Sequence, residues 1–261
     1  MVYRAIDLDI GTSIWARGGT MRLQNKIALV TGASRGIGRA SALALAKEGA
    51  TVAGCARTRT DLDAMVREVE QGGGKALGIE CDVTKSSSVA ACVKRVVEEL
   101  GAVDILVNNA GVGGYRPFLE WSEADYDRIM ATNTKSTWLF CREVIPHMRK
   151  QKGGHIINVA SVAGMQGYPS EAIYCASKFA QLGLTQALDR EFWQENIKVS
   201  AVCPGGVETS FALGDGRTAG APNMSGFSTA EDVAEAVVLA AVPRARSRIV
   251  NIVLRPMNEQ T

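Results

Sequence analysis

The sequence of 261 residues has no long hydrophobic run and no strong excess of charge of one sign. No stretch approaches the ~18 uninterrupted apolar residues that a membrane-spanning helix needs. The formal net charge is only +2, from 29 basic and 27 acidic residues. That balance argues against a global field for nucleic acid or another polyanion, although it leaves a local basic patch open. We expect a soluble, cytoplasmic protein that binds neither nucleic acid nor a membrane.

Cysteine and histidine show none of the spacings that mark a metal site or a disulfide framework. The six cysteines contain no C-x-x-C pair and are Cys55, Cys81, Cys92, Cys141, Cys175 and Cys203. Several fall in apolar, strand-like runs, so we interpret them as buried reduced thiols, which favours a reducing compartment. His147 and His155 stand apart from carboxylates and cysteines and are interpreted as surface or packing residues. No zinc or calcium site is predicted.

Residues 1–24 lack an apolar core of signal-peptide length and carry Asp7 and Asp9. They match no structural pattern, and we interpret them as a flexible leader, with a functional arm as the alternative. A second methionine, Met21, leaves the translation start open. The remaining length suits one large α/β domain over residues 25–256, followed by a short tail over 257–261.

Short apolar runs alternate with helical patterns along this domain. The expected strands cover residues 26–31, 51–56, 75–81, 103–107, 155–160, 197–203 and 249–254. The expected helices cover residues 37–48, 61–70, 88–100, 123–149, 172–195 and 231–241. The strands are continuously apolar, which is typical of a parallel sheet covered on both faces. We therefore predict a three-layer, Rossmann-type, doubly wound sheet of about seven mostly parallel strands in a single domain.

The segment 209–229 is rich in Gly, Ala, Ser and Pro and shows no clear secondary structure. A gap of that length is unusual in a compact domain and is often an active-site lid. We predict a substrate lid here, with an ordinary solvent loop as the alternative.

A glycine-rich turn joins the first expected strand to the first expected helix. Its glycines are Gly32, Gly36 and Gly38, a spacing that differs from G-x-G-x-x-G. Glycines at this position let the backbone approach a pyrophosphate, whose charge meets the N-terminus of the helix. The turn alone is weak evidence for a nucleotide site.

Tyr174 and Lys178 are four residues apart on an expected helix, so their side chains share one face. An ammonium close to a phenol favours the phenolate and lowers the pKa of the tyrosine. Such a pair could act as a general acid or base, although an ordinary surface pair has the same spacing.

Further motifs occur in a fixed order around this pair. They are Thr31-Gly32-x-x-x-Gly36-x-Gly38, Asn108-Asn109-Ala110-Gly111, Asn133, Ser161, Tyr174-x-x-x-Lys178 and Pro204-Gly205. With these motifs the chain resembles the short-chain dehydrogenase/reductase family in its single-domain form, over about residues 25–254.

The resemblance implies a role for each matching residue. Tyr174 would exchange a proton with the substrate oxygen, Ser161 would hydrogen-bond that oxygen, and Lys178 would lower the pKa of Tyr174 and hold the nicotinamide ribose. Asn133 would support a water that relays protons from Lys178. The implied cofactor contacts are Gly32, Ser34, Arg35, Gly36, Ile37, Gly38, Asp82, Val83, Asn109, Ala110, Gly111, Tyr174, Lys178, Pro204, Gly205, Val207 and Thr209.

The end of the second strand indicates which nicotinamide cofactor is bound. An acidic residue there would take the adenosine ribose hydroxyls of NAD, yet no carboxylate precedes Asp61. Arg57 stands there instead, and Arg35 could approach from the glycine turn. A guanidinium matches the geometry of a 2′-phosphate. We predict NADP(H) over NAD(H), with two solvated surface arginines as the alternative.

The predicted function is the NADP(H)-dependent interconversion of a carbonyl and a secondary alcohol. The lining of the substrate site is expected from residues 113–118, 162–168 and 210–227, with Tyr115, Met165, Gln166, Tyr168, Phe211, Leu213, Arg217, Met224 and Phe227 as candidates. A 3-ketoacyl thioester and a 3-hydroxy acid both stay open as substrates. The ending Arg248 to Pro256 resembles members that act on 3-hydroxy acids. A non-catalytic NADP(H) sensor or scaffold is the alternative outside enzymes, and the long expected helices favour a homodimer or homotetramer.

Overall fold

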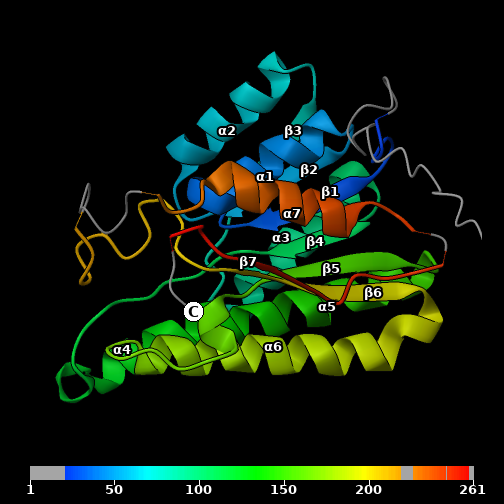
Figure 1. Ribbon diagram of the computed structural model, residues 1–261. Helices are drawn as coiled ribbons and strands as arrows, with labels where there is room; N and C mark the ends of the chain where they lie inside the picture. The colour runs from blue at the N-terminus through cyan, green and yellow to red at the C-terminus, as the bar shows by residue number, and fades with distance from the viewer. Residues whose placement is uncertain (1–20, 219–225, 245, 259–261) are drawn as a thin grey trace, which may run out of the picture.

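The computed structural model describes residues 21–218, 226–244 and 246–258 (Figure 1). The strands are β1 (Ile27–Thr31), β2 (Thr51–Ala56), β3 (Lys75–Glu80), β4 (Ile105–Asn108), β5 (Gly154–Val159), β6 (Ile197–Pro204) and β7 (Asn251–Leu254). The α-helices are α1 (Gly36–Lys47), α2 (Arg59–Gln71), α3 (Ser86–Leu100), α4 (Glu123–Met130), α5 (Ser136–Lys150), α6 (Ala172–Phe192) and α7 (Ala230–Ala241). Short 3-10 or π turns are η1 (Phe118–Glu120), η2 (Ala131–Lys135), η3 (Val162–Gly164) and η4 (Trp193–Glu195).

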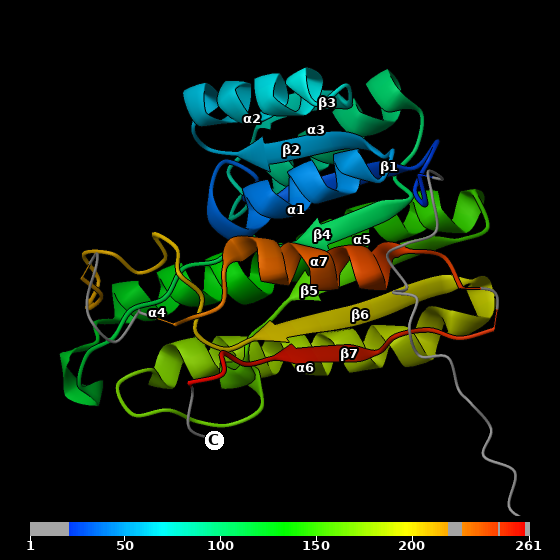
Figure 2. The ribbon, with the colours of Figure 1, turned by 45° about the horizontal axis from the view of Figure 1, so that its top comes forward.

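The strands form one sheet in the order β3-β2-β1-β4-β5-β6-β7, and every neighbouring pair is parallel (Figure 2). The chain moves outward from β1 to β3 and then returns to place β4 on the other side of β1. The strand order therefore reverses between β1 and β4. A doubly wound sheet binds its ligands at the carboxyl ends of the strands beside such a switch point.

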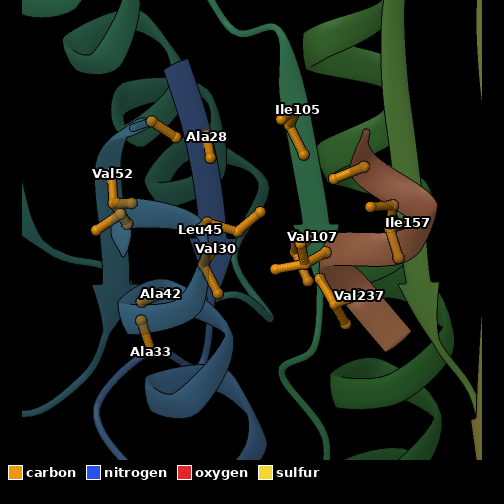
Figure 3. Packing of buried hydrophobic residues seen from close by; sticks show 14 of the residues in the cluster. Ala28, Val30, Ala33, Ala42, Leu45, Val52, Ile105, Val107, Ile157 and Val237 are labelled. Atoms are coloured by element: carbon orange, nitrogen blue, oxygen red, sulfur yellow. The ribbon is translucent and has the colours of Figure 1, made fainter. Parts of the chain in front are cut away.

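Helices cover both faces of the sheet, because successive strand residues point to opposite sides. Ala28 and Val30 of β1 pack with α1, α2 and α7, whereas Leu29 between them packs with α3 and α5. Figure 3 shows the first of these layers, with Val237 of α7 beside Val107 and Ile157. The predicted three-layer sheet of parallel strands is confirmed.

The expected helical stretch over residues 123–149 is confirmed, and the structure adds a π turn at its centre. A capping box between Ser122 and Asp125 starts α4, the π turn η2 follows it, and α5 then continues to Lys150. The π turn contains Asn133, whose side chain bonds both backbone polar groups of Val112. Helical periodicity in the sequence does not reveal this local widening of the helix, because the residue that Asn133 bonds, Val112, lies about twenty residues earlier in the chain.

The expected boundary of the leader at residue 24 also needs correction. Leu23 is fully buried in the core, and its N–H donates to the carbonyl of Glu48 at 2.8 Å. Arg22 makes an ion pair with the Glu48 carboxylate. These residues thus belong to the folded domain, while residues 1–20 of the predicted leader, 219–225 of the predicted lid and 259–261 of the predicted tail lie outside the described part.

Among the described helices α6 is the longest, with 21 residues. Besides apolar residues, its buried face carries the polar side chains of Ser177, Lys178, Gln181 and Thr185. No helix in the described ranges is both long and apolar enough to cross a lipid bilayer. Helix α6 packs against β6, Thr185 and Lys178 make hydrogen bonds to β5, and Lys178 lines the site described next.

Candidate active site

A cavity of about 1050 Å³ opens at the carboxyl ends of the strands. It extends from the glycine turn after β1 to the segment after β6. Ser161, Tyr174 and Lys178 line it, together with every predicted cofactor contact except Gly38. Asn133 is the predicted catalytic residue that does not line the cavity. Segments that are far apart in the sequence therefore converge where the sheet topology places a ligand.

The glycine turn fits close to the backbone of β4. Gly32 and Gly36 have φ angles of +65° and +53°, which an L side chain rarely adopts. A Cβ on Gly38 would lie 2.2 Å from the Gly32 carbonyl oxygen and 2.3 Å from Asn109 Nδ2. Helix α1 begins at Gly36, so the free N–H groups of its first turn lie at the cavity. This arrangement suits a bound phosphate group.

Thr31 and Asn109 join the carboxyl ends of β1 and β4. Thr31 Oγ1 accepts the backbone N–H groups of Asn109 at 3.0 Å and Ala110 at 2.9 Å. Asn109 Nδ2 donates to the Thr31 carbonyl at 2.9 Å. These bonds satisfy polar groups at the strand ends and fix the floor of the cavity at the switch point.

Arg35 and Arg57 are both exposed at one end of the cavity. In the part of the chain that the structure describes, neither makes an ion pair with a carboxylate, whereas the neighbouring Arg59 pairs with Asp63 at 2.9 Å. Two guanidinium groups are thus available to an anion at this point. Asp82 is held locally, since its Oδ1 accepts the Thr84 hydroxyl at 2.7 Å, and this bond lowers the pKa of the Asp82 carboxyl.

Tyr174 lies in the cavity wall against Phe211, with ring centroids 5.6 Å apart and planes tilted by 55°. Gly113 allows this contact, because a Cβ there would lie 2.7 Å from the Phe211 ring. Burial raises the pKa of the Tyr174 phenol above its ordinary value, and a hydrogen bond with the Ser161 hydroxyl acts in the opposite direction. The phenol therefore keeps its proton at neutral pH.

Lys178 lies one helical turn further along α6. Its Nζ donates to the Val159 carbonyl at 3.0 Å and to Gln181 Oε1 at 2.8 Å, and it lies 5.6 Å from the centre of the Tyr174 ring. Burial lowers the pKa of Lys178 to about 8, which leaves it mainly charged at pH 7. Burial of the phenol is the dominant effect, so the net pKa of Tyr174 lies above its ordinary value, and the expected lowering of that pKa by Lys178 stays a prediction.

Ser161 lies two residues after the end of β5 and caps the N-terminus of the 3-10 turn η3. Its Oγ accepts the N–H of Ala163 at 3.1 Å and donates to the Pro204 carbonyl at 3.4 Å. The second of these bonds is long, so the hydroxyl can exchange it for a better acceptor. Ser161 thus stands between the ends of β5 and β6, beside the Tyr174 phenol.

Asn133 is fully buried behind the cavity wall. Its Oδ1 accepts the N–H of Val112 at 2.8 Å, and its Nδ2 donates to the Val112 carbonyl at 2.8 Å and to Ser177 Oγ at 2.9 Å. The side chain therefore fixes the loop after Gly111 against α6. It makes no direct hydrogen bond to Lys178 among those that the described residues form.

The predicted substrate lining is confirmed only in part. Tyr115, Tyr168, Phe211, Arg217 and Phe227 line the cavity, whereas Met165, Gln166 and Leu213 do not, and Met224 lies outside the described residues. Sequence reasoning missed Glu171, which lines the cavity one turn before Tyr174. Burial raises the pKa of its carboxyl to about 7. The sequence could have indicated this residue, because a spacing of three residues places Glu171 and Tyr174 on the same side of a helix.

The cysteines and His155 are buried, as the sequence predicted. All six cysteines are free thiols, and the sulfur atoms of Cys55, Cys81 and Cys92 lie within 4.8 Å of one another. His155 bonds Ser200 Oγ at 2.7 Å, and burial lowers its pKa to about 3. A neutral imidazole with a hydroxyl partner is a packing residue, away from the cavity lining.

The profile of the short chain dehydrogenase family matches residues 26–217. The chain belongs to this family. Two relatives within it are a 3-oxoacyl-[acyl-carrier-protein] reductase of Thermotoga maritima, 39% identical over 72% of this chain and 77% of the relative, and a 3beta-hydroxysteroid dehydrogenase of Mediterraneibacter gnavus, 42% identical over 72% and 68%. The predicted family is confirmed, and the chain is an oxidoreductase.

Solved structures of the family share the whole architecture. A metagenomic short-chain oxidoreductase in complex with NADP is 35% identical, with a TM-score of 0.79, over 91% of this chain and 100% of that one. An alcohol dehydrogenase from the archaeon Thermococcus sibiricus, complexed with 5-hydroxy-NADP, is 29% identical, with a TM-score of 0.83, over 90% and 98%. Both carry NADP or an NADP derivative.

Proposed function

We propose that this short chain dehydrogenase interconverts a carbonyl and a secondary alcohol with NADP(H), using Tyr174 as the general acid and base. The observation that supports this proposal most strongly is that Tyr174, Ser161 and Lys178 line one cavity, whose other end is formed by the glycine turn. A proton donor and a nucleotide site thus share one cavity.

The residues present fit NADP(H). Gly32 and Gly36 line the cavity without a side chain, so a pyrophosphate can approach the backbone there, and Gly38 lets α1 pack closely against the glycine turn and Asn109. Arg35 and Arg57 would hold a 2′-phosphate, since the structure places both at the cavity without a carboxylate partner in its described part. The adenine would lie by Asp82 and Val83, and the nicotinamide by Pro204, Gly205, Val207 and Thr209.

When bound, the nicotinamide supplies or accepts the hydride. In reduction the Tyr174 hydroxyl gives its proton to the substrate oxygen, and in oxidation the phenolate takes that proton back. The raised pKa of Tyr174 keeps the acid form ready for reduction. Ser161 would hydrogen-bond the same oxygen, and the Lys178 ammonium would stabilise the phenolate that forms. Asn133 would act through the loop it holds and through a water near Lys178.

The relatives and the lining indicate the substrate class. Two relatives are named for chemistry at a 3-oxo or 3-hydroxy carbon. Phe211 and Phe227 give this cavity apolar walls, and Arg217 adds a positive charge, its guanidinium donating to the Val207 carbonyl at 2.9 Å. This combination suits a 3-ketoacyl thioester or a 3-hydroxy acid. A sensor or scaffold would have no need of the complete set of Ser161, Tyr174 and Lys178.

A homodimer or homotetramer is the proposed assembly. Aromatic side chains are exposed along the outer faces of α4, α5 and α6, at Tyr126, Trp138 and Phe179, with exposed fractions of 48%, 44% and 47%. Exposed aromatic residues on adjacent helices are typical of surfaces that a partner covers. Measurement of the molar mass in solution, with Trp138→Glu as the perturbed variant, tests this assembly.

The test of the function is NADPH oxidation over a panel of carbonyls, with NADH in parallel. The panel holds a 3-ketoacyl thioester, a 3-keto acid ester, a diketone and a quinone. We expect turnover with NADPH and a loss of about 10²-fold or more in Tyr174→Phe, whose ring keeps the contact with Phe211. Preference for NADH would refute the arginine argument, and equal rates in the variant would refute the role of Tyr174.

A further inference from the structure

The Lys178 ammonium is buried without a carboxylate partner. Its exposed fraction is 4%, and among the described residues no aspartate or glutamate makes an ion pair with it. Its two hydrogen-bond acceptors are the Val159 carbonyl and Gln181 Oε1, and Gln181 is fully buried. A buried charge costs a great deal of free energy unless neighbouring dipoles compensate it. The glutamine amide is therefore one of two groups that keep this ammonium charged.

The orientation of that amide is fixed by a chain of hydrogen bonds. The Thr137 hydroxyl has one proton, which it donates to the Asn133 carbonyl at 2.8 Å. Thr137 Oγ1 must then accept the bond from Gln181 Nε2, also at 2.8 Å. With its nitrogen directed at Thr137, the amide presents its oxygen to Lys178. The π turn that contains Asn133 thus determines which end of Gln181 faces the lysine.

The helix carries a second restraint on Gln181. Its backbone carbonyl accepts the Thr185 hydroxyl at 2.7 Å, and Thr185 Oγ1 in turn accepts from Asn158 Nδ2 of β5 at 2.8 Å. Side chains from α5, α6 and β5 therefore form one buried network around the glutamine. A leucine or methionine would fill the same space without supplying an acceptor.

We propose that Gln181 is a positioning residue that holds the Lys178 ammonium in its charged form and aims it at the Tyr174 side of the cavity. This inference rests on the proposed function only in giving Lys178 a role in the reaction. The contact itself belongs to the free protein. Gln181 does not itself line the cavity, and it acts through Lys178, which does.

Few other groups that titrate face the lysine. On α6 there is Tyr174, with its ring centre 5.6 Å away, and on β6 there is the Cys203 thiol, which interacts with Lys178 electrostatically. From β5 the contact is the Val159 carbonyl, and from the π turn and α5 the nearby groups are Asn133 and Thr137, which do not titrate. A change at Gln181 should therefore appear directly in the titration of Lys178.

The test is the pKa of Lys178 in the free protein, measured by NMR of lysine labelled with ¹³C at Cε. The signal is assigned with Lys178→Met. Gln181→Met removes the acceptor and should lower the pKa of Lys178 by about one unit or more, since the lost hydrogen bond stabilises only the charged form of the lysine. Gln181→Glu supplies a carboxylate and should raise the pKa by a similar amount. The alkaline limb of kcat/KM should move in the same two directions.

Two further variants serve as controls. Ser200→Ala tests whether loss of any buried hydrogen bond shifts the lysine pKa, and Thr137→Val perturbs the same network if the Gln181 variants fail to fold. Ser200→Ala removes the buried bond to His155 and should leave the Lys178 titration unchanged. Thr137→Val frees the far end of the amide and should lower the lysine pKa by less than Gln181→Met does. A Lys178 pKa that stays within about 0.3 unit in both glutamine variants would overturn the inference. If the two Gln181 variants shift the Lys178 pKa as expected but Lys178→Met keeps full activity, the proposed function of the lysine is refuted while the inference about Gln181 stands.

Discussion

The two halves of the sheet handle charge in different ways. The cofactor half, β1 to β3 with α1 to α3, offers backbone N–H groups at a glycine turn and two exposed guanidinium groups. The catalytic half, β4 to β6 with α5 and α6, buries an ammonium within a network of neutral side chains. The cofactor half is arranged to bind the charge of a ligand, whereas the catalytic half contains a buried charge of its own at neutral pH.

Because of this difference, the two halves depend on different features of their residues. In the cofactor half the important feature is the lack of a side chain at Gly38, where backbone atoms leave no space. In the catalytic half it is the identity and direction of side chains such as Gln181 and Thr137. Substitutions should therefore separate binding of the nucleotide from transfer of the proton.

The largest expected effect comes from Gly38→Ala. The new Cβ would lie 2.2 Å from the Gly32 carbonyl oxygen, a backbone atom that cannot move without disturbing β1. We expect the free energy of unfolding to fall by about 3 kcal/mol or more, as in severe overpacking, together with loss of nucleotide binding. Denaturant unfolding monitored by circular dichroism measures the first effect, and NADPH fluorescence measures the second.

Gly72→Ala is the matched control for that substitution. Gly72 has a φ of −77°, and a Cβ there would meet carbonyl oxygens only at 3.4 Å and beyond. We expect a change within about 0.5 kcal/mol. Equal effects of the two substitutions would show that the glycine turn is not the tightly packed point of the cofactor half.

A smaller effect is expected from Arg57→Ala. Loss of a charge-assisted bond to the 2′-phosphate should weaken NADPH binding by about 10- to 100-fold and leave NADH binding nearly unchanged. At saturating NADPH the turnover rate should stay close to that of the unaltered protein. Arg59→Ala is the control, since Arg59 pairs with Asp63 and does not line the cavity. Equal weakening of NADPH and NADH would contradict the assignment.

The smallest expected effect is a difference between the two halves in how the free energy of unfolding depends on pH. Burial raises the pKa of Glu171 to about 7 from an ordinary value of 4.5, so the unfolded chain releases this proton first. The stability contributed by Glu171 is then lost as the pH rises from about 4.5 to about 7. Glu171→Gln should therefore gain stability relative to the unaltered protein across that window, as urea unfolding at several pH values would show.

The carboxyl of Asp82 in the cofactor half should behave in the opposite sense. Its pKa is lowered by the bonds from Thr84, so its contribution is present above the ordinary pKa and is lost as the pH falls. Asp82→Asn should accordingly lose stability relative to the unaltered protein near neutral pH. Parallel pH profiles for the two variants would be inconsistent with the two environments described above.

Much of the fold was predictable because hydrophobic patterning determines it locally. The apolar runs marked the strands, and the glycine turn and the Tyr174/Lys178 spacing identified both ends of the cavity. The π turn at Asn133 was not predictable, because it depends on Val112 in a distant loop. Gln181 and Glu171 were missed for a related reason: only packing reveals that a polar side chain on a helix is buried and what it faces.

The most direct test of this account measures NADPH binding and NADPH oxidation separately in Tyr174→Phe. The dissociation constant is taken from cofactor fluorescence, and the rate from a single turnover with a carbonyl that the unaltered protein reduces. We expect binding within about threefold of the unaltered protein and oxidation slower by about 10²-fold or more. An unchanged rate, or a rate that falls only in proportion to weakened binding, would contradict the separation of the two halves.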